Sequence, residues 1–157
     1  MKIDISKLLQ TELLGKKIGE FLSNFDGLAI FYLDGNLGAG KTTLVREILK
    51  AMGWKNAVKS PTFSILEEYQ IANKDIFHCD LYRLDNQNDF DMLGIEITEN
   101  SNGIFFIEWP NKVSRFNFGE EFFLKLSLTN QTRYIEFETN NKKFLNCIDG
   151  ININNPI

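Results

Sequence analysis

The chain has 157 residues, of which 43% are hydrophobic and 24% are charged, which suits one globular domain and is too short for two of ordinary size. These proportions exclude an intrinsically disordered, collagen-like or fibrous protein. The formal net charge is −4, whereas a protein that binds DNA or RNA by itself usually carries a basic surplus that replaces counterions on the phosphates. We therefore expect no stable DNA binding.

The sequence indicates neither a membrane span nor a disulfide framework. No apolar run approaches the roughly 20 residues of a transmembrane helix, and the first residues lack the apolar stretch of a secretory signal. The two cysteines, Cys79 and Cys147, are far apart and fit no metal-binding spacing. We expect a reduced, cytoplasmic protein with no membrane partner.

Hydrophobic periodicity in the first two thirds of the chain predicts alternating helices and strands. Apolar residues recur at three- and four-residue steps over residues 8–24 and 41–52, which predicts two amphipathic helices. Short apolar runs at 28–33 and 103–107 are typical of strands buried on both faces. Further expected elements are an extended stretch at 63–71, a strand at 76–81 and a short helix at 85–93.

The last third of the chain has a different character. Residues 121–128 and 134–138 are rich in strand-forming residues and are separated by a polar segment, which predicts an antiparallel hairpin. After Thr139 the chain is rich in asparagine, so we expect residues 140–157 to form a loosely ordered tail. Alternating elements followed by a hairpin predict a single α/β domain over residues 1–139, with a mixed central sheet flanked by helices.

One stretch carries a specific chemical signal. Residues 35–42, Gly-Asn-Leu-Gly-Ala-Gly-Lys-Thr, fit the phosphate-binding pattern G-x-x-x-x-G-K-[ST]. The glycines let backbone N–H groups wrap a phosphate, and the helix that follows adds the positive end of its dipole. Lys41 would lie between the β- and γ-phosphates, and the hydroxyl of Thr42 would ligate Mg²⁺. The buried strand before this loop and the helix after it predict a P-loop NTPase domain.

A P-loop also needs a carboxylate at the end of a nearby strand, where it holds Mg²⁺ or a water of the metal. Glu108 follows four apolar residues, 104–107, in the pattern of a Walker B strand with Glu in place of Asp. Asp80 ends a second, less apolar strand and is the other candidate. His78, the single histidine, could sense phosphate or position water, or could be a hydrogen-bonded structural residue.

The loop and the two acids leave several classes of NTPase open. A GTPase should carry N-K-x-D, but residues 111–114 read Asn-Lys-Val-Ser and lack the acid, which counts against guanine specificity. A kinase usually gathers arginines around the transferred phosphate, whereas the four arginines of this chain are scattered along it. A small-metabolite kinase and a nucleotide-dependent binding module with incidental hydrolysis are the alternatives to a dedicated ATPase.

Four segments in this order and spacing resemble one family. They are residues 35–43 (GNLGAGKTT), 60–63 (SPTF), 78–84 (HCDLYRL) and 107–110 (IEWP). Together they are similar to the TsaE (YjeE) family, the bacterial P-loop ATPases of tRNA threonylcarbamoyladenosine biosynthesis. The similarity runs from about residue 11 to residue 133, which is most of the chain.

The resemblance implies ATP as the ligand, Mg²⁺ as the cofactor and slow ATP hydrolysis. It also implies docking on the proteins TsaB and TsaD, whose complex transfers threonylcarbamoyl to the tRNA adenosine beside the anticodon. The tRNA would be held by these partners and would meet this subunit only indirectly, which agrees with its negative net charge.

The resemblance further implies roles for single residues. Thr42 and Glu108 would hold Mg²⁺, and Asp80 would act on the attacking water or on the metal shell, with Lys41 as the other catalytic residue. The ATP-binding residues would be Thr11, Gly38, Ala39, Gly40, Lys41, Thr42, Thr43 and Arg133. A switch-like loop over the γ-phosphate would consist of Ser60, Pro61, Thr62 and Phe63.

Two further positions near the site follow from the sequence. Trp109 directly follows Glu108 and precedes a proline that restricts the backbone, so we expect its indole beside the metal site. Asn36 stands where the family usually has aspartate, which puts any carboxylate role at that position in doubt. The backbone cradle of the loop should be unaffected.

Overall fold

The structure is a computed structural model that describes residues 1–99, 101–149 and 151. Its strands are β1 (Lys2–Asp4), β2 (Leu28–Asp34), β3 (Leu66–Ile71), β4 (Lys74–Asp80), β5 (Gly103–Glu108), β6 (Glu120–Thr129) and β7 (Thr132–Glu138). Its helices are α1 (Leu8–Ser23), α2 (Lys41–Ala51), α3 (Gln87–Asp91) and α4 (Lys142–Asp149), with a 3₁₀ turn η1 (Pro110–Lys112). None of the helices in the described ranges is long and apolar enough to cross a bilayer.

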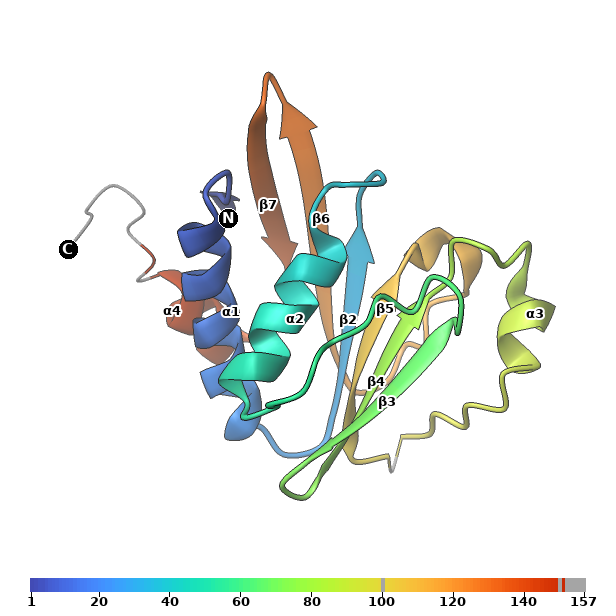
Figure 1. Cartoon of the computed structure of the whole chain (residues 1–157). Coiled ribbons are helices and arrows are strands. Elements are labelled where there is room, and N and C mark those ends of the chain that lie inside the picture. The colour runs from blue at the N-terminus through green and yellow to red at the C-terminus, as the bar shows by residue number, and fades with distance from the viewer. Residues whose placement is uncertain (100, 150, 152–157) are drawn as a thin grey trace.

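The strands form one mixed sheet of seven, in the order β1-β7-β6-β2-β5-β4-β3 (Figure 1). The central strands β6, β2, β5 and β4 are parallel to one another, whereas β7 and β1 on one side and β3 on the other pair antiparallel. The hairpin β6–β7 and the mixed sheet of an α/β domain are therefore confirmed. The parallel centre also brings the carboxyl ends of β2, β5 and β4 to one edge of the sheet.

Both faces of the sheet are covered. Helices α1, α2 and α4 lie on one face and share a core with it, while α3 and the loop segments around residues 93–97 and 113–118 cover the other (Figure 1). Strands β2 and β5 are buried along almost their whole length because both faces are packed. This explains why the sequence shows continuous apolar runs at these two strands.

Close packing of α1 against α2 fixes the helix that begins at the glycine-rich loop. A methyl group added at Gly15 would lie 2.6 Å from the Cβ of Glu47, and one added at Gly19 would lie 2.7 Å from the Cβ of Ala51. Any larger residue at these two positions would push the helices apart. The position of α2, and of the loop before it, therefore depends on two small residues of α1.

The expectation of a loosely ordered tail is wrong for residues 142–149, which form helix α4. The side chain of Phe144 is 0% exposed and its ring lies 4.7 Å from that of Phe122, between the sheet and α1. Asparagine-rich composition hid this helix, because two buried residues one turn apart, Phe144 and Ile148, are enough to anchor it. Residues 150 and 152–157 of the expected tail lie outside the described residues, and the domain boundary at residue 139 stays a prediction.

Strand β1 was not expected from the sequence. It consists of three residues that pair with β7, from Lys2 opposite Glu136 to Asp4 opposite Tyr134. A strand of this length has too few residues to show an alternating pattern. It matters for the site because it directs the chain from the edge of the sheet into α1.

The packing of α4 can be tested by Phe144→Ala. Truncating this fully buried ring should lower the free energy of unfolding by about 3 kcal/mol, because it removes apolar contacts and leaves a cavity. Urea unfolding measures the change, with Lys143→Ala on the exposed face of the same helix as the control, expected within about 0.5 kcal/mol of the parent. Equal stability of the two variants would contradict the docked position of α4.

Candidate functional site

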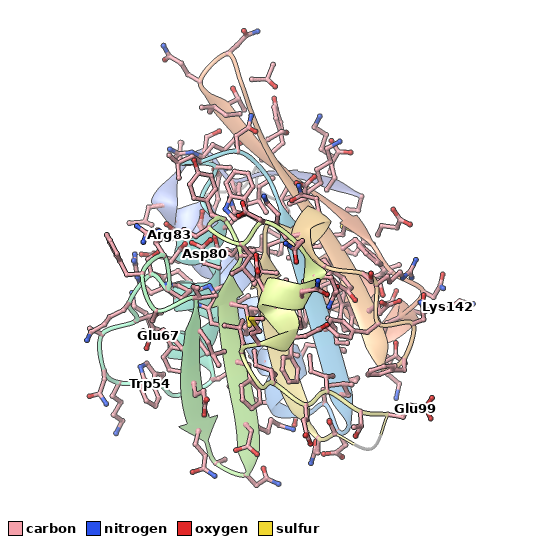
Figure 2. All side chains as sticks on the ribbon, turned by 90° about the vertical axis from the view of Figure 1, so that its right-hand side faces the viewer. Trp54, Glu67, Asp80, Arg83, Glu99 and Lys142 are labelled. Atoms are coloured by element: carbon pink, nitrogen blue, oxygen red, sulfur yellow. The ribbon has the colours of Figure 1, made fainter. Side chains whose placement is uncertain are left out.

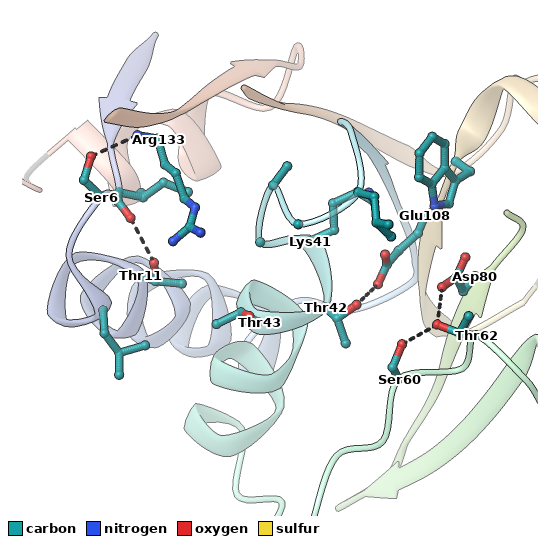
Figure 3. Close-up of a pocket in the computed structure, with 17 residues that line it drawn as sticks. Ser6, Thr11, Lys41, Thr42, Thr43, Ser60, Thr62, Asp80, Glu108 and Arg133 are labelled. Atoms are coloured by element: carbon teal, nitrogen blue, oxygen red, sulfur yellow. Dashed lines mark hydrogen bonds between the residues drawn. The ribbon is translucent and has the colours of Figure 1, made fainter. Parts of the chain in front are cut away.

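A cavity of about 420 Å³ lies at the carboxyl edge of the parallel strands, beside the N-terminus of α2 (Figure 3). Strands β4 and β5 end in register, with Asp80 opposite Glu108, and Leu33 near the end of β2 is also opposite Glu108. This register places two carboxylates side by side at the mouth of the cavity, as the sequence predicted for the ends of these strands.

The glycine-rich loop forms the floor of the cavity. It turns after β2, and α2 begins at Lys41 directly after Gly40, which has a φ of 106° that favours glycine. Gly35 is needed for a second reason, because a Cβ there would lie 2.6 Å from the carbonyl oxygen of Leu126 in β6. The loop is thus held against β6 while its backbone and the first turn of α2 face the cavity.

Lys41 is buried and its ammonium is held by the loop itself. Its Nζ donates to the carbonyl oxygens of Gly35 at 2.7 Å and Asn36 at 3.3 Å, and lies 4.3 Å from the ring centre of Trp109. Desolvation lowers the pKa of Lys41, and this shift is opposed by the nearby carboxylates, chiefly that of Glu108. The Lys41 ammonium is therefore poorly hydrated and can bind an anion in the cavity.

Glu108 links β5 to α2. The Thr42 hydroxyl donates to Oε1 of Glu108 at 2.7 Å, and the Nε2 atom of His78 lies 2.8 Å from the same oxygen. Glu108 is 3% exposed, so its charge depends on these polar partners. Among the described residues no group of three or more His, Cys, Asp or Glu side chains is arranged to bind a metal by itself.

Asp80 is fixed by two donors. Its Oδ2 accepts from the hydroxyl of Thr62 at 3.1 Å, and its Oδ1 accepts from the backbone N–H of Tyr82 at 3.1 Å (Figure 3). Thr62 is in turn 2.7 Å from the hydroxyl of Ser60. The segment before β3 is thereby tied to the end of β4.

Only part of the segment 60–63 faces the cavity. Ser60 and Thr62 line it, whereas Pro61 is buried outside it and Phe63 is 82% exposed. The guanidinium of Arg83 lies 4.4 Å from the centre of the Phe63 ring, on the protein surface near Asp80 (Figure 2). Residues 61–64 form a turn, in which the backbone N–H of Ile65 donates to the carbonyl of Pro61, so the extended stretch expected from residue 63 begins only at β3. A turn sends neighbouring side chains in different directions, which places Thr62 in the cavity and Phe63 on the surface.

The opposite wall of the cavity comes from β1, α1 and β7. Thr11 in the first turns of α1 donates to the carbonyl of Ile5 at 3.4 Å, and the backbone N–H of Arg133 donates to the hydroxyl of Ser6 at 2.9 Å (Figure 3). Thr11 and Arg133 both line the cavity, although 122 residues separate them in sequence. The β1–β7 pairing brings the start of α1, with Thr11, next to Arg133 at the start of β7.

The structure brings most of the predicted site residues to this one cavity. Those that line it are Thr11, Gly38, Ala39, Gly40, Lys41, Thr42, Thr43, Ser60, Thr62, Asp80, Glu108, Trp109 and Arg133. Those that do not are Pro61, Phe63 and His78. Sequence reasoning missed four lining residues, Ile5, Ser6, Leu8 and Leu37. The first three lie directly after β1, a strand too short to be recognised from the sequence.

A family model supplies the decisive comparison: the model for threonylcarbamoyl adenosine biosynthesis protein TsaE matches residues 5–141. This chain belongs to the TsaE family. A relative in Haemophilus influenzae, tRNA threonylcarbamoyladenosine biosynthesis protein TsaE, is 45% identical over 62% of this chain and 63% of its own. The protein of the same name in Nostoc is 36% identical over 71% of this chain and 69% of its own.

The fold is also found in a solved structure. The crystal structure of Bacillus subtilis YdiB aligns with a TM-score of 0.66 and 19% sequence identity, covering 95% of this chain and 91% of that one. This likeness confirms the fold of the TsaE-family chain. The match to the Haemophilus influenzae relative spans less than two thirds of that protein's length.

The bond between α2 and β5 can be tested with Thr42→Val, which removes the hydroxyl and keeps the shape. We expect the free energy of unfolding to fall by about 1.5 kcal/mol, because a buried carboxylate loses one of its donors. Thr43→Val is the control in urea unfolding, since the Thr43 hydroxyl makes no side-chain hydrogen bond within the described part of the chain. Equal losses in the two variants would show that the Thr42–Glu108 bond contributes nothing.

Proposed function

We propose that this chain is the Mg²⁺-dependent, ATP-binding and slowly hydrolysing subunit of tRNA threonylcarbamoyladenosine formation, acting with the TsaB and TsaD proteins. The observation that carries the proposal is the hydrogen bond of Thr42 to Glu108 at the mouth of a glycine-rich loop whose lysine is desolvated. It joins the two groups that a P-loop enzyme needs around its metal.

The loop supplies the phosphate site. The first turn of α2 offers backbone N–H groups that have no partner within the helix, and the helix dipole favours an anion there. Lys41 holds two carbonyls of its own loop, Gly35 and Asn36, and exchanges them for phosphate oxygens when the ligand arrives. Because its ammonium is already desolvated, a phosphate interacts with it more strongly than in water.

The residues at the mouth fit a magnesium ion. Mg²⁺ is usually bound by one or two protein oxygens together with waters and substrate phosphates, so a cluster of three acidic ligands is not needed. Thr42 can offer an oxygen lone pair to the ion while its hydroxyl still donates a hydrogen bond to Oε1 of Glu108. Bound Mg²⁺ would neutralise charge on the phosphate oxygens and favour in-line attack by water.

We infer that Asp80 orients that water. The donors Thr62 and Tyr82 each occupy one oxygen of its carboxylate and hold it at the end of β4, opposite Glu108. Each oxygen keeps a second lone pair that can accept from a water molecule. Ser60 and Thr62 would form the switch-like wall beside the γ-phosphate, while Thr11 and Arg133 would contact the remainder of the nucleotide.

Partner contact is supported by exposed apolar side chains at the rim of the cavity. Leu37 in the loop is 81% exposed and Leu8 on α1 is 61% exposed, and both line the cavity. Apolar side chains exposed around a polar site are typical of a surface that another protein covers. With a net charge of −4, this subunit would leave tRNA binding to TsaB and TsaD.

The proposal is tested by measuring phosphate release from ATP by this chain alone and with purified TsaB and TsaD from the same source. We expect slow, Mg²⁺-dependent release that rises when both partners are present. Transfer of the phosphate to a small metabolite would contradict the proposal in favour of a kinase. Nucleotide binding without hydrolysis, both for the chain alone and with the partners, would contradict the proposal in favour of a nucleotide-dependent binding module.

The variant Lys41→Met distinguishes the contribution of Lys41 to phosphate binding from its contribution to the stability of the fold. Nucleotide affinity should fall about 100-fold, since a charge-assisted contact is lost. Stability should stay within about 0.5 kcal/mol of the parent or rise, because desolvation lowers the pKa of Lys41 and folding therefore disfavours its charged form at every pH below the ordinary lysine pKa.

Calorimetric titration with ATP and urea unfolding measure these two quantities. The control is Lys50→Met on the same helix, where the lysine is exposed and pairs with Glu47. This control should keep full affinity. Unchanged affinity in a folded Lys41→Met protein would contradict the assignment of the loop.

A further inference from the structure

His78 is a buried polar residue that the proposed reaction does not use. Its imidazole is 0% exposed, it lies on β4 two residues before Asp80, and its Nε2 is 2.8 Å from Oε1 of Glu108. Along β4 the side chains alternate, so His78 shares the face of Ile76, which packs in the core formed with α1 and α2. The ring therefore reaches Glu108 from beneath the cavity, and it does not line the cavity.

The two polar groups that contact Glu108 converge on one oxygen. The Thr42 hydroxyl and the His78 Nε2 meet Oε1 from α2 and from β4, while Oε2 accepts no hydrogen bond from the described residues. A carboxylate oxygen has two lone pairs, so Oε1 is fully used. Since Glu108 lines the cavity, Oε2 is the oxygen left for a cation or for its water.

The hydrogen-bond pattern fixes the form of the ring. Nδ1 of His78 is buried and has no hydrogen-bond partner within the described part of the chain. A proton on Nδ1 would be a buried, unsatisfied donor, whereas a bare Nδ1 leaves only a lone pair unused. The neutral ring with its proton on Nε2 fits this environment and makes His78 a donor to Glu108.

Without that donor the carboxylate would have a competing partner. The charges of Glu108 and Lys41 already interact, and both residues line the cavity. A Glu108 side chain held by Thr42 alone could rotate toward the ammonium, and the resulting ion pair would occupy both the metal ligand and the phosphate ligand. A buried donor on β4 prevents this rotation without bringing a charge into the cavity.

We propose that His78 is a positioning residue of the Mg²⁺ site: through Nε2–H it locks the Glu108 carboxylate so that Oε2 faces the cation. The proposal rests on the Mg²⁺–nucleotide function above and names a residue that sets metal affinity without touching metal or nucleotide. Partners of this kind, which orient a metal ligand, typically change metal affinity by 10- to 100-fold when they are removed.

The test compares His78→Gln with His78→Met, two side chains of similar length of which only glutamine can donate. The measurement is the Mg²⁺ concentration that gives half-maximal ATP binding, with ATP binding in EDTA as the reference. We expect a rise of about 10-fold in His78→Met, a rise of under about 3-fold in His78→Gln, and unchanged binding in EDTA for both. A merely structural histidine would alter both variants alike and would also lower binding in EDTA.

The outcomes separate this inference from the proposed function. A folded His78→Met protein with parental Mg²⁺ dependence overturns the positioning role, and so do equal shifts in both variants. Parental protein that binds ATP without any Mg²⁺ dependence overturns the proposed function instead.

If His78→Met does not fold, nitrogen NMR of the parental protein decides, because the chain has a single histidine. The imidazole ¹⁵N shifts should show a neutral ring protonated on Nε2. A ring protonated on Nδ1, or one exchanging between the two forms, overturns the inference.

Discussion

The hydrogen bond between Thr42 and Glu108 ties the first turn of α2 to the end of β5, and the arrangement of the site depends on it. It is possible only because β2, β5 and β4 are parallel and end at the same edge, next to the loop that leads into α2. The same edge brings Asp80 beside Glu108. It also brings both carboxylates close enough to Lys41 for their charges to interact with its ammonium. One topological feature thus brings Lys41, Asp80 and Glu108 together.

Burying charged and polar groups at this edge costs stability, and the hydrophobic cores on the two faces of the sheet offset that cost. Lys41, Glu108 and His78 are all nearly inaccessible to water, and a desolvated charge is tolerated only when hydrogen bonds or opposite charges satisfy it. Around them, the face covered by α1, α2 and α4 holds a cluster of phenylalanine rings, with Phe31 stacked 4.4 Å from Phe122. Such aromatic packing stabilises the fold independently of the polar site.

Much of the site could be predicted from the sequence because its chemistry lies in contiguous motifs. The loop at residues 35–42 and the acid after an apolar run, Glu108, are local patterns, and the structure places both at one cavity. The buried strands β2 and β5 were predictable for a similar reason, since packing on both faces leaves a continuous apolar run.

The remainder depends on contacts between distant segments. Strand β1 is defined by its pairing with β7 and is too short to show an alternating pattern. Helix α4 is defined by the burial of Phe144 and Ile148, whose one-turn spacing stands in an asparagine-rich segment. The position of His78 beneath the site depends on the register of β4 with β5, which a single sequence does not reveal. The outward direction of Phe63 likewise follows from tertiary contacts, here with Arg83.

The most direct test of the central claim, that Mg²⁺–ATP binds at this edge, is tryptophan fluorescence, because the chain has two tryptophans on different parts of the structure. Trp109 lies 4.3 Å from the ammonium of Lys41, whereas Trp54 follows the far end of α2 and packs against Tyr69 (Figure 2). Titration with Mg²⁺–ATP should change the emission of Trp54→Phe as in the parent and leave Trp109→Phe nearly silent. A response that persists in Trp109→Phe and vanishes in Trp54→Phe would contradict the account.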